Sequence, residues 1–296
     1  MNTLSALSHL SASRCDAFTM TWEEIADSTD KIAIVPVGSL EQHGPHLPLG
    51  TDTIIGMGIA NTVAAGLEQL ATSSPELGIA GAVVLPPIDY GYRSNPFSGG
   101  GPLFPGTVDL SATTVIALFE DVLGELIADG FHKILIVNSH FENQFPIQEA
   151  MIKVDAATGH QAVMVQTNWW DPLPESVIKE VFSEDIFPGW ALEHGAVTET
   201  SLMLHLAPNL VRTDRIPLLA PFTPPTHIRV PNRASDIPPA GSLANAATAT
   251  AAKGEIITRA TTDGILAICL DEFGAVPTPA SAATDTAPQM HVPAGA

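Results

Sequence analysis

The chain has 296 residues, of which 45% are hydrophobic and 15% are charged, and its formal net charge is −20 at pH 7. The charge reflects a shortage of basic residues, with 12 Lys and Arg against 32 Asp and Glu. Such a surface repels nucleic acids and anionic membranes and favours a neutral or cationic small molecule. The length allows one large α/β domain or two small ones, with enough apolar residues for a substantial core.

The cysteines and the N-terminus indicate a cytoplasmic protein. Cys15 and Cys269 are far apart in sequence and form no metal-type or disulfide pattern. The N-terminal residues are rich in Ser and lack the charged start and apolar run of a signal peptide. No apolar stretch approaches the roughly 20 residues that a membrane helix requires. We expect an irregular leader at 1–19, one domain at 20–275 and a disordered Pro/Ala/Thr-rich tail at 276–296.

Strands and helices alternate along the predicted domain. Thr21-Trp22-Glu23-Glu24 resembles a capping box that opens a short helix. Apolar runs predict strands at 31–37, 81–88, 133–137 and 162–167. Helical spacing of apolar residues predicts helices at 54–70, from Asp109 or Ser111 to Gly130, and at 146–158, 197–206 and 244–270. This alternation is typical of an α/β fold whose mostly parallel sheet is covered on both faces.

Two stretches lack any such pattern. Residues 91–107 are rich in Gly and Pro, and residues 218–241 are rich in Pro, so both are expected to be irregular. The first stretch is either a flexible loop or a substrate loop in which glycines let the backbone approach a ligand.

Polar clusters follow three of the predicted strands, at the strand ends where ligands bind in such folds. Glu41-x-His43 is a weak signal by itself, but His140-x-Glu142 mirrors it after another strand, and Asp52 precedes an apolar helix. These five side chains offer oxygen and nitrogen ligands without a thiolate. They suit two divalent ions about 3.5–4 Å apart that share one carboxylate. His46 is an alternative ligand, although we expect it to bond a loop carbonyl instead.

The same residues belong to motifs that resemble the creatininase family of metal-dependent amidohydrolases. The resemblance runs from about residue 21 to residue 273 and implies a three-layer α-β-α sandwich and a hexamer. The matching motifs are Pro36-Val37-Gly38-x-Leu40-Glu41-Gln42-His43-Gly44 with Asp52, Gly91-Tyr92, Ser98-Gly99-Gly100-Gly101, Phe104-Pro105-Gly106-Thr107, Asn138-x-His140-x-Glu142-Asn143, Trp170-Asp171, Gly189-Trp190 and Glu193-His194-Gly195-x-Val197-x-Glu199.

By this resemblance, two divalent ions, zinc or manganese, are bound in each subunit. Glu41 and His140 would hold one ion and His43 and Glu142 the other, with Asp52 as the bridge. A hydroxide that bridges the two ions would attack the carbonyl carbon of the amide.

The resemblance also assigns acid–base and substrate residues. His194 would transfer protons, and Glu199 would orient its imidazole. The residues that the resemblance places against the substrate are Ser98, Phe141, Trp170 and Trp190, whereas Trp169 is interpreted as core packing.

Two departures from the family pattern bear on the substrate. Phe141 and Ala191 stand where members that hydrolyse creatinine have Tyr and Asp, so two polar groups that could bond the substrate are missing. The leading interpretation is hydrolysis of a small cyclic amide, creatinine to creatine first of all. Alternatives are another cyclic amide such as a hydantoin or lactam, a formamide, a short peptide, or a binding protein without turnover. Retention of the five ligands with His194 and Glu199 favours an enzyme.

Overall fold

The structure, a computed structural model, describes residues 15–98, 103–219 and 222–274. Within them the sheet has four strands, all parallel, in the order β2-β1-β3-β4. The strands are β1 (Ile32–Val37), β2 (Ala82–Val84), β3 (Lys133–Asn138) and β4 (Val163–Asn168). The four predicted strands and the parallel sheet are therefore confirmed. The predicted leader before residue 15, the glycines at 99–101 and the predicted tail lie outside the described residues.

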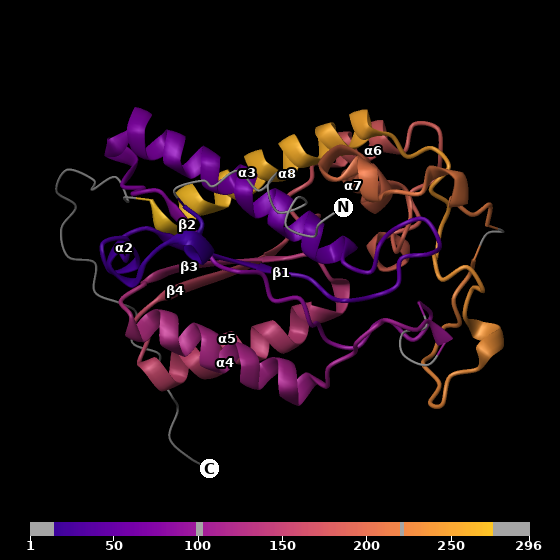
Figure 1. The fold of residues 1–296 in the computed structure, drawn as a ribbon, viewed down its shortest axis with the longest axis horizontal. Coiled ribbons are helices and arrows are strands. Elements are labelled where there is room, and N and C mark those ends of the chain that lie inside the picture. The colour runs from indigo at the N-terminus through magenta and orange to yellow at the C-terminus, as the bar shows by residue number, and fades with distance from the viewer. Residues whose placement is uncertain (1–14, 99–102, 220–221, 275–296) are drawn as a thin grey trace, which may run out of the picture.

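Helices cover both faces of the sheet (Figure 1). On one face lie α3 (Thr51–Ser73), α7 (Val197–Leu206) and α8 (Ala251–Phe273), and on the other lie α4 (Ala112–Ala128) and α5 (Gln144–Thr158). Every residue of β1 is buried because its alternate side chains enter two separate cores. This explains the continuous apolar run of the strand and confirms the three-layer α-β-α sandwich.

Strand β2 is shorter than the sequence predicted. Pro86 and Pro87 have no backbone N–H, so the ladder stops after Val84. Pairing resumes at one residue, where the N–H of Ile88 donates to the carbonyl of Pro36 at 3.0 Å.

Several helix boundaries also differ from the prediction. Helix α8 begins at Ala251 rather than at residue 244, with Thr250 as its N-cap accepting a bond from the N–H of Lys253. The short helix α2 (Trp22–Ala26) starts at the predicted capping box on Thr21. Helix α6 (Glu175–Val181) was not predicted.

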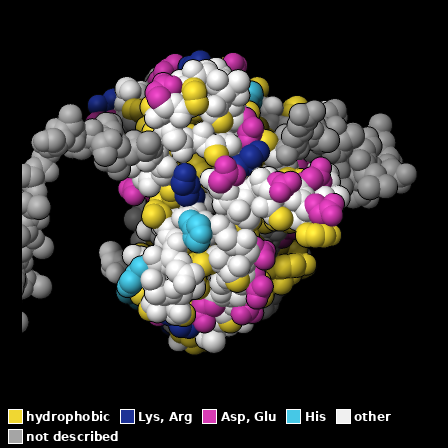
Figure 2. Space-filling view, turned by 90° about the vertical axis from the view of Figure 1, so that its left-hand side faces the viewer, with side chains coloured by type: hydrophobic (Ala, Val, Ile, Leu, Met, Phe, Trp, Pro, Cys, Tyr) yellow, Lys and Arg dark blue, Asp and Glu magenta, His cyan; other side chains and the backbone are white. Residues whose placement is uncertain are grey.

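One helix in the described ranges, α3, has the length and apolar composition of a membrane span. The prediction that no stretch approaches this length therefore needs correction. In this fold Ile55, Ile59, Val63 and Leu67 bury one side of α3 in the core between α3 and the sheet. Figure 2 shows acidic side chains spread over one face of the molecule, where basic side chains form no continuous patch.

Candidate metal and catalytic site

Buried amide side chains join the carboxyl ends of the strands. Asn138, the last residue of β3, donates from Nδ2 to the carbonyl of His140 and to Oδ1 of Asn168, both at 2.7 Å. Asn143 donates to the carbonyl of Gly38, beyond β1, at 3.0 Å. Because buried hydrogen-bond networks of this kind are rigid, the loops after β1, β3 and β4 are fixed relative to one another.

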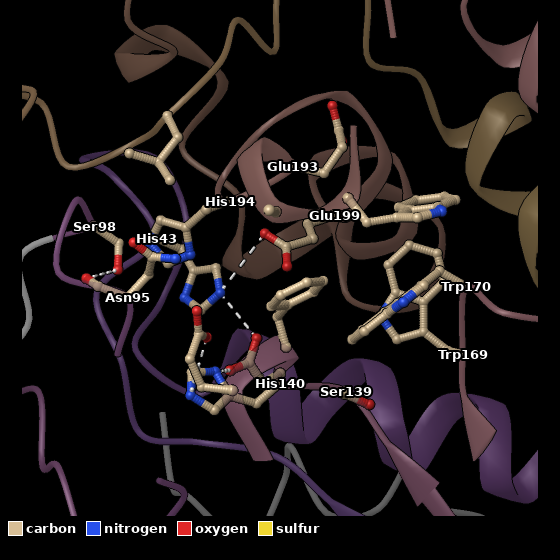
Figure 3. Close-up of a pocket in the computed structure, with 16 residues that line it drawn as sticks. His43, Asn95, Ser98, Ser139, His140, Trp169, Trp170, Glu193, His194 and Glu199 are labelled. Carbon is tan, nitrogen blue, oxygen red and sulfur yellow. Dashed lines mark hydrogen bonds and ion pairs between the residues drawn. The ribbon is translucent and has the colours of Figure 1, made fainter. Parts of the chain in front are cut away.

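Side chains from distant parts of the sequence converge at the ends of these strands and at the first turns of α3 and α7 (Figure 3). Three groups of potential metal ligands have their nitrogen and oxygen atoms within 4.8 Å of one another. The groups are Glu41 with Asp52 and His140, His43 with Asp52 and Glu199, and Glu41 with His43 and His194. Asp52 belongs to the first two groups, which is the arrangement expected of a carboxylate between two ions.

The two central histidines face the carboxylates at short range. His43 Nε2 lies 2.8 Å from Asp52 Oδ1 and 3.6 Å from Glu199 Oε2. His140 Nδ1 lies 3.0 Å from Glu41 Oε2 and 3.3 Å from Asp52 Oδ2. Glu41 Oε2, His43 Nε2 and Asp52 Oδ2 are buried without a hydrogen-bond partner of good geometry.

The opposite nitrogen of each ring is bonded to a backbone carbonyl. His43 Nδ1 lies 3.0 Å from the carbonyl of Glu41, and His140 Nε2 lies 2.9 Å from the carbonyl of Tyr92. A carbonyl oxygen only accepts, so these ring nitrogens carry protons, and the nitrogens facing the carboxylates would offer lone pairs to an ion that displaces their protons. Metal-bound histidines are oriented in this way. The oxygen and nitrogen donor set therefore fits divalent ions such as zinc or manganese.

Positive charge stabilises two carboxylates of this cluster, whereas at Glu199 burial outweighs the effect of His43 and raises the pKa to about 8. Burial opposes ionisation of Glu41 and Asp52, but the neighbouring imidazoles outweigh it and lower both pKa values. Burial likewise opposes protonation of His43, yet Asp52 and Glu199 raise its pKa to about 10, and the pKa of His140 is also raised. Ions placed among these carboxylates would satisfy the same electrostatic requirement.

The grouping differs from the expected ligand set at one position. Glu142 is in none of the three groups, and its Oε2 lies 3.6 Å from His140 Nε2, the nitrogen already bonded to a carbonyl. Glu199 lies beside His43 instead, and its Oε2 accepts a 2.6 Å bond from the N–H of Gly195. Gly195 has φ +60°, and a Cβ there would lie 2.9 Å from the carbonyl oxygen of His43. Glycine is therefore required at this turn.

No hydrogen bond or ion pair joins Glu199 to His194 among the described residues, although both line the same cavity. The nitrogen of the Gln42 amide lies 3.0 Å from His194 Nε2. Burial lowers the pKa of His194 to about 4, so its imidazole is neutral at pH 7. Its Nε2 also lies 3.7 Å from Glu41 Oε1. His194 is thus poised as a neutral base beside the cluster.

Gln42 is a site residue to which the sequence analysis gave no role. Its Nε2 also donates to the carbonyls of Ser98, at 2.8 Å, and Gly241, at 3.1 Å. It therefore ties three separate loops to His194. Its place between two candidate ligands, Glu41 and His43, was the available signal.

Ser98, expected to contact substrate, lines the cavity beside the cluster and also bonds within the protein. Its Oγ lies 3.1 Å from Glu41 Oε1 and 2.9 Å from the carbonyl of Asn95. His46 bonds Thr200 Oγ1 at 2.9 Å, so it has a structural partner, although that partner is a hydroxyl rather than a carbonyl.

Aromatic rings form one wall of the same cavity, whose volume is about 30 Å³. The rings of Phe141 and Trp170 are stacked with centroids 5.9 Å apart, and Trp170 stacks on Trp190 at 6.3 Å. Phe141 is 38% exposed, whereas Trp169 is 1% exposed and packs edge-on against Trp170 and Trp190. Trp169 packs in the core, as interpreted, and it also lines the cavity, as does Ala191.

Comparison with known proteins agrees with this geometry. The family model described as "Creatininase: Creatinine amidohydrolase" matches residues 19–269. The chain is 34% identical to a creatinine amidohydrolase of Pseudomonas putida over 262 residues, which are 86% of this chain and 95% of that protein. It is also 34% identical to a mycofactocin precursor peptide peptidase of Mycolicibacterium smegmatis over 232 residues, 76% and 79% of the two chains.

Solved structures give the same result. A crystal structure of creatinine amidohydrolase matches with a TM-score of 0.80 at 32% identity, covering 88% of this chain and 98% of that one. The matching creatininase structures include a manganese form and a Zn-Zn form.

Proposed function

Because this chain belongs to the creatininase family, we propose that its natural substrate is a small cyclic amide, with creatinine as the first candidate. As a family member it is an amidohydrolase, a hydrolase of carbon–nitrogen bonds. The observation that carries the substrate proposal is a wall of stacked flat rings, Phe141, Trp170 and Trp190, directly beside the ligand cluster. By the family resemblance we also propose a cytoplasmic homohexamer.

We propose two divalent ions, zinc or manganese. Glu41, Asp52 and His140 would hold one, and His43, Asp52 and Glu199 the other, so that Asp52 is shared. Support comes from the unpartnered donor atoms and from the carbonyl bonds that orient both imidazoles. When bound, such ions supply a water of lowered pKa and polarise the amide carbonyl.

The protein's own groups would then move the protons. His194 is neutral near pH 7 and can take a proton at Nε2 from the attacking water and return it to the leaving nitrogen. Gln42 holds that nitrogen in place. Glu142 lines the same cavity, and burial raises its pKa to about 7, so it can also exchange a proton at neutral pH.

The aromatic wall would bind the substrate ring. A planar amide ring packs well against stacked aromatic faces, and a cationic ring gains a further attraction from them. The cavity is small, so a substrate enters by displacing the partly exposed ring of Phe141. This ring offers no hydroxyl, so the wall itself contributes shape and apolar contact rather than hydrogen bonds.

A second candidate is hydrolysis of a short peptide. The mycofactocin precursor peptide peptidases, with up to 34% identity, favour it, and so does the apolar character of Phe141.

The test is a comparison of kcat/KM for metal-loaded protein on creatinine, a hydantoin, a lactam, a formamide and short peptides, with chelator-treated protein as the control. We expect the highest value for creatinine. Turnover of a hydantoin or a peptide with none of creatinine would overturn the proposal.

A further inference from the structure

A second and larger cavity lies next to the catalytic one. Its volume is about 280 Å³, against about 30 Å³ for the catalytic cavity. It lies between the segment from the end of α6 through η5 (Trp190–Leu192) and the loop 243–245. Its apolar lining includes Phe182, Ile186, Pro188, Leu192, Val197 and Leu243. Glu193 and Leu243 line both cavities, so one layer of side chains separates them.

The carboxylate of Glu193 is buried in this dividing wall. The side chain is 4% exposed, and its Oε2 accepts bonds from the N–H and the Oγ1 of Thr198 at 2.8 and 2.5 Å. Its Oε1 is buried and has no hydrogen-bond partner in the described chain. In Figure 3 the side chain of Glu193 points away from His43 and His140. The two bonds to Thr198 thus hold Oε1 as a fixed acceptor outside the ligand cluster, and a buried acceptor without a partner costs free energy.

The charged side chain that lines the cavity besides Glu193 is also negative. Asp185 stands exposed at the rim of the cavity, and no Lys, Arg or His is among the described residues that line it. Burial, with the negative charge of Asp185 added to it, raises the pKa of Glu193 to about 7. At pH 8 the carboxylate is ionised and lacks a counter-charge.

We propose that this cavity is a second ligand site, which binds a small organic cation through an ammonium group that reaches the buried Glu193 Oε1 by displacing the side chains covering it, and through an apolar body between Phe182, Leu192 and Leu243. A volume somewhat below that of drug-sized pockets suits one ring or a short alkyl chain. The cation is either a separate molecule or, where the side chains of Glu193 and Leu243 part, the far end of a substrate whose amide lies at the ligand cluster. The site itself does not depend on which amide the enzyme hydrolyses.

Isothermal titration calorimetry at pH 8 tests the site, with benzylammonium chloride as the probe and the metal-loaded full chain as the protein. We expect saturable binding of one probe per chain. Glu193→Gln should weaken it at least about tenfold, because a hydrogen bond to a charged group is lost. Benzyl alcohol, of similar size but neutral, should bind at least about tenfold more weakly than benzylammonium. Glu255→Gln, which removes an exposed carboxylate on α8, is the matched control and should change nothing.

A second variant, which fills the cavity, tests the proposal independently of whether Glu193→Gln folds. Ala244 lines the cavity, so the ring of Ala244→Phe should occupy it and abolish binding of the probe. Equal affinity of the wild-type protein and Glu193→Gln, survival of binding in Ala244→Phe, or no saturable binding at millimolar probe would each overturn the proposal.

Steady-state kinetics in the presence of benzylammonium distinguish the two sources of the cation. The substrate is whichever amide among creatinine, the hydantoin, the lactam, the formamide and the peptides is hydrolysed fastest. A probe that raises KM and leaves kcat unchanged occupies the place of the far end of the substrate. A probe that leaves KM unchanged while saturating the cavity is a separate ligand.

Discussion

The carboxylate pair of Glu41 and Asp52 and the single carboxylate of Glu193 are buried almost equally in this molecule, but they differ in charge state. Glu41 and Asp52 are each 1% exposed, and their pKa values are lowered. Glu193 is 4% exposed, and its pKa is raised to about 7. Burial by itself raises all three pKa values. The difference is that imidazoles of His43 and His140 surround the first pair, whereas no basic side chain of the described residues faces Glu193.

For these three carboxylates, the charged neighbours account for the difference, because burial acts on all of them in the same direction. The first pair is arranged around positive charge and suits metal ions. Glu193 is an acceptor that the fold leaves without a partner.

The largest effect is expected for Asp52→Asn. The change removes the carboxylate common to two ligand groups, so we expect loss of both ions and a fall in kcat/KM on the order of 10⁴-fold. Metal content measured by mass spectrometry beside activity checks this. Asp263→Asn, at an exposed position on α8, is the control. An Asp52→Asn protein that kept two ions would show that Asp52 is not their bridge.

His194→Gln should separate proton transfer from metal binding. Because His194 lies beside the cluster as a neutral base, we expect kcat to fall by about 10²–10³-fold with two ions retained per chain. Kinetics and metal analysis on the same preparation measure both quantities. His132→Gln, on the surface, should behave as the wild type does. Loss of an ion in His194→Gln would mean that His194 is a ligand.

Glu193→Gln should stabilise the fold in a pH-dependent manner. The folded-state pKa of Glu193, about 7, lies above its ordinary value of 4.5, so the wild-type protein loses stability as pH rises between these values. Gln does not titrate. The variant should therefore match the wild type below pH 4.5 and exceed it above pH 7 by about 3 kcal/mol.

Urea unfolding of both proteins between pH 5 and pH 8 measures this difference. A difference that stays constant with pH would show that the carboxylate is not held in an unfavourable charged state.

The smallest effect is expected at the edge of the catalytic cavity. Phe141 is 38% exposed, so Phe141→Tyr adds a hydroxyl without disturbing the core. If creatinine is the natural substrate, kcat/KM should rise or change less than about tenfold. Phe145→Tyr, at a 71% exposed position on α5, is the control. A loss of more than about 100-fold in Phe141→Tyr would indicate a substrate of another shape.

The sheet was predictable because its signal is local. Continuous apolar runs mark strands that are buried on both faces, and the described structure has four strands where the sequence predicts them. The start of α8 was not predictable in this way. The Ala-rich segment 244–249 favours a helix, but Asn245 holds it in an irregular loop by bonds to the backbone N–H and carbonyl of Leu219. This long-range contact overrides local propensity.

The site was predictable in outline for a related reason. Glu41, His43, Asp52 and His140 follow or precede apolar elements whose ends meet, and the structure brings them together. The position of Glu199 beside His43 depends on the left-handed turn at Gly195, which a residue pattern does not reveal. The cavity beside Glu193 likewise arises from the packing of two loops that are far apart in sequence.

Anomalous diffraction at the metal absorption edges, from crystals of the full chain loaded with zinc or manganese, tests the central claim most directly. The account predicts two ions in each chain, both in contact with Asp52, the first also on Glu41 and His140 and the second on His43 and Glu199. A single ion, or a second ion bound by Glu142 in place of Glu199, would contradict it.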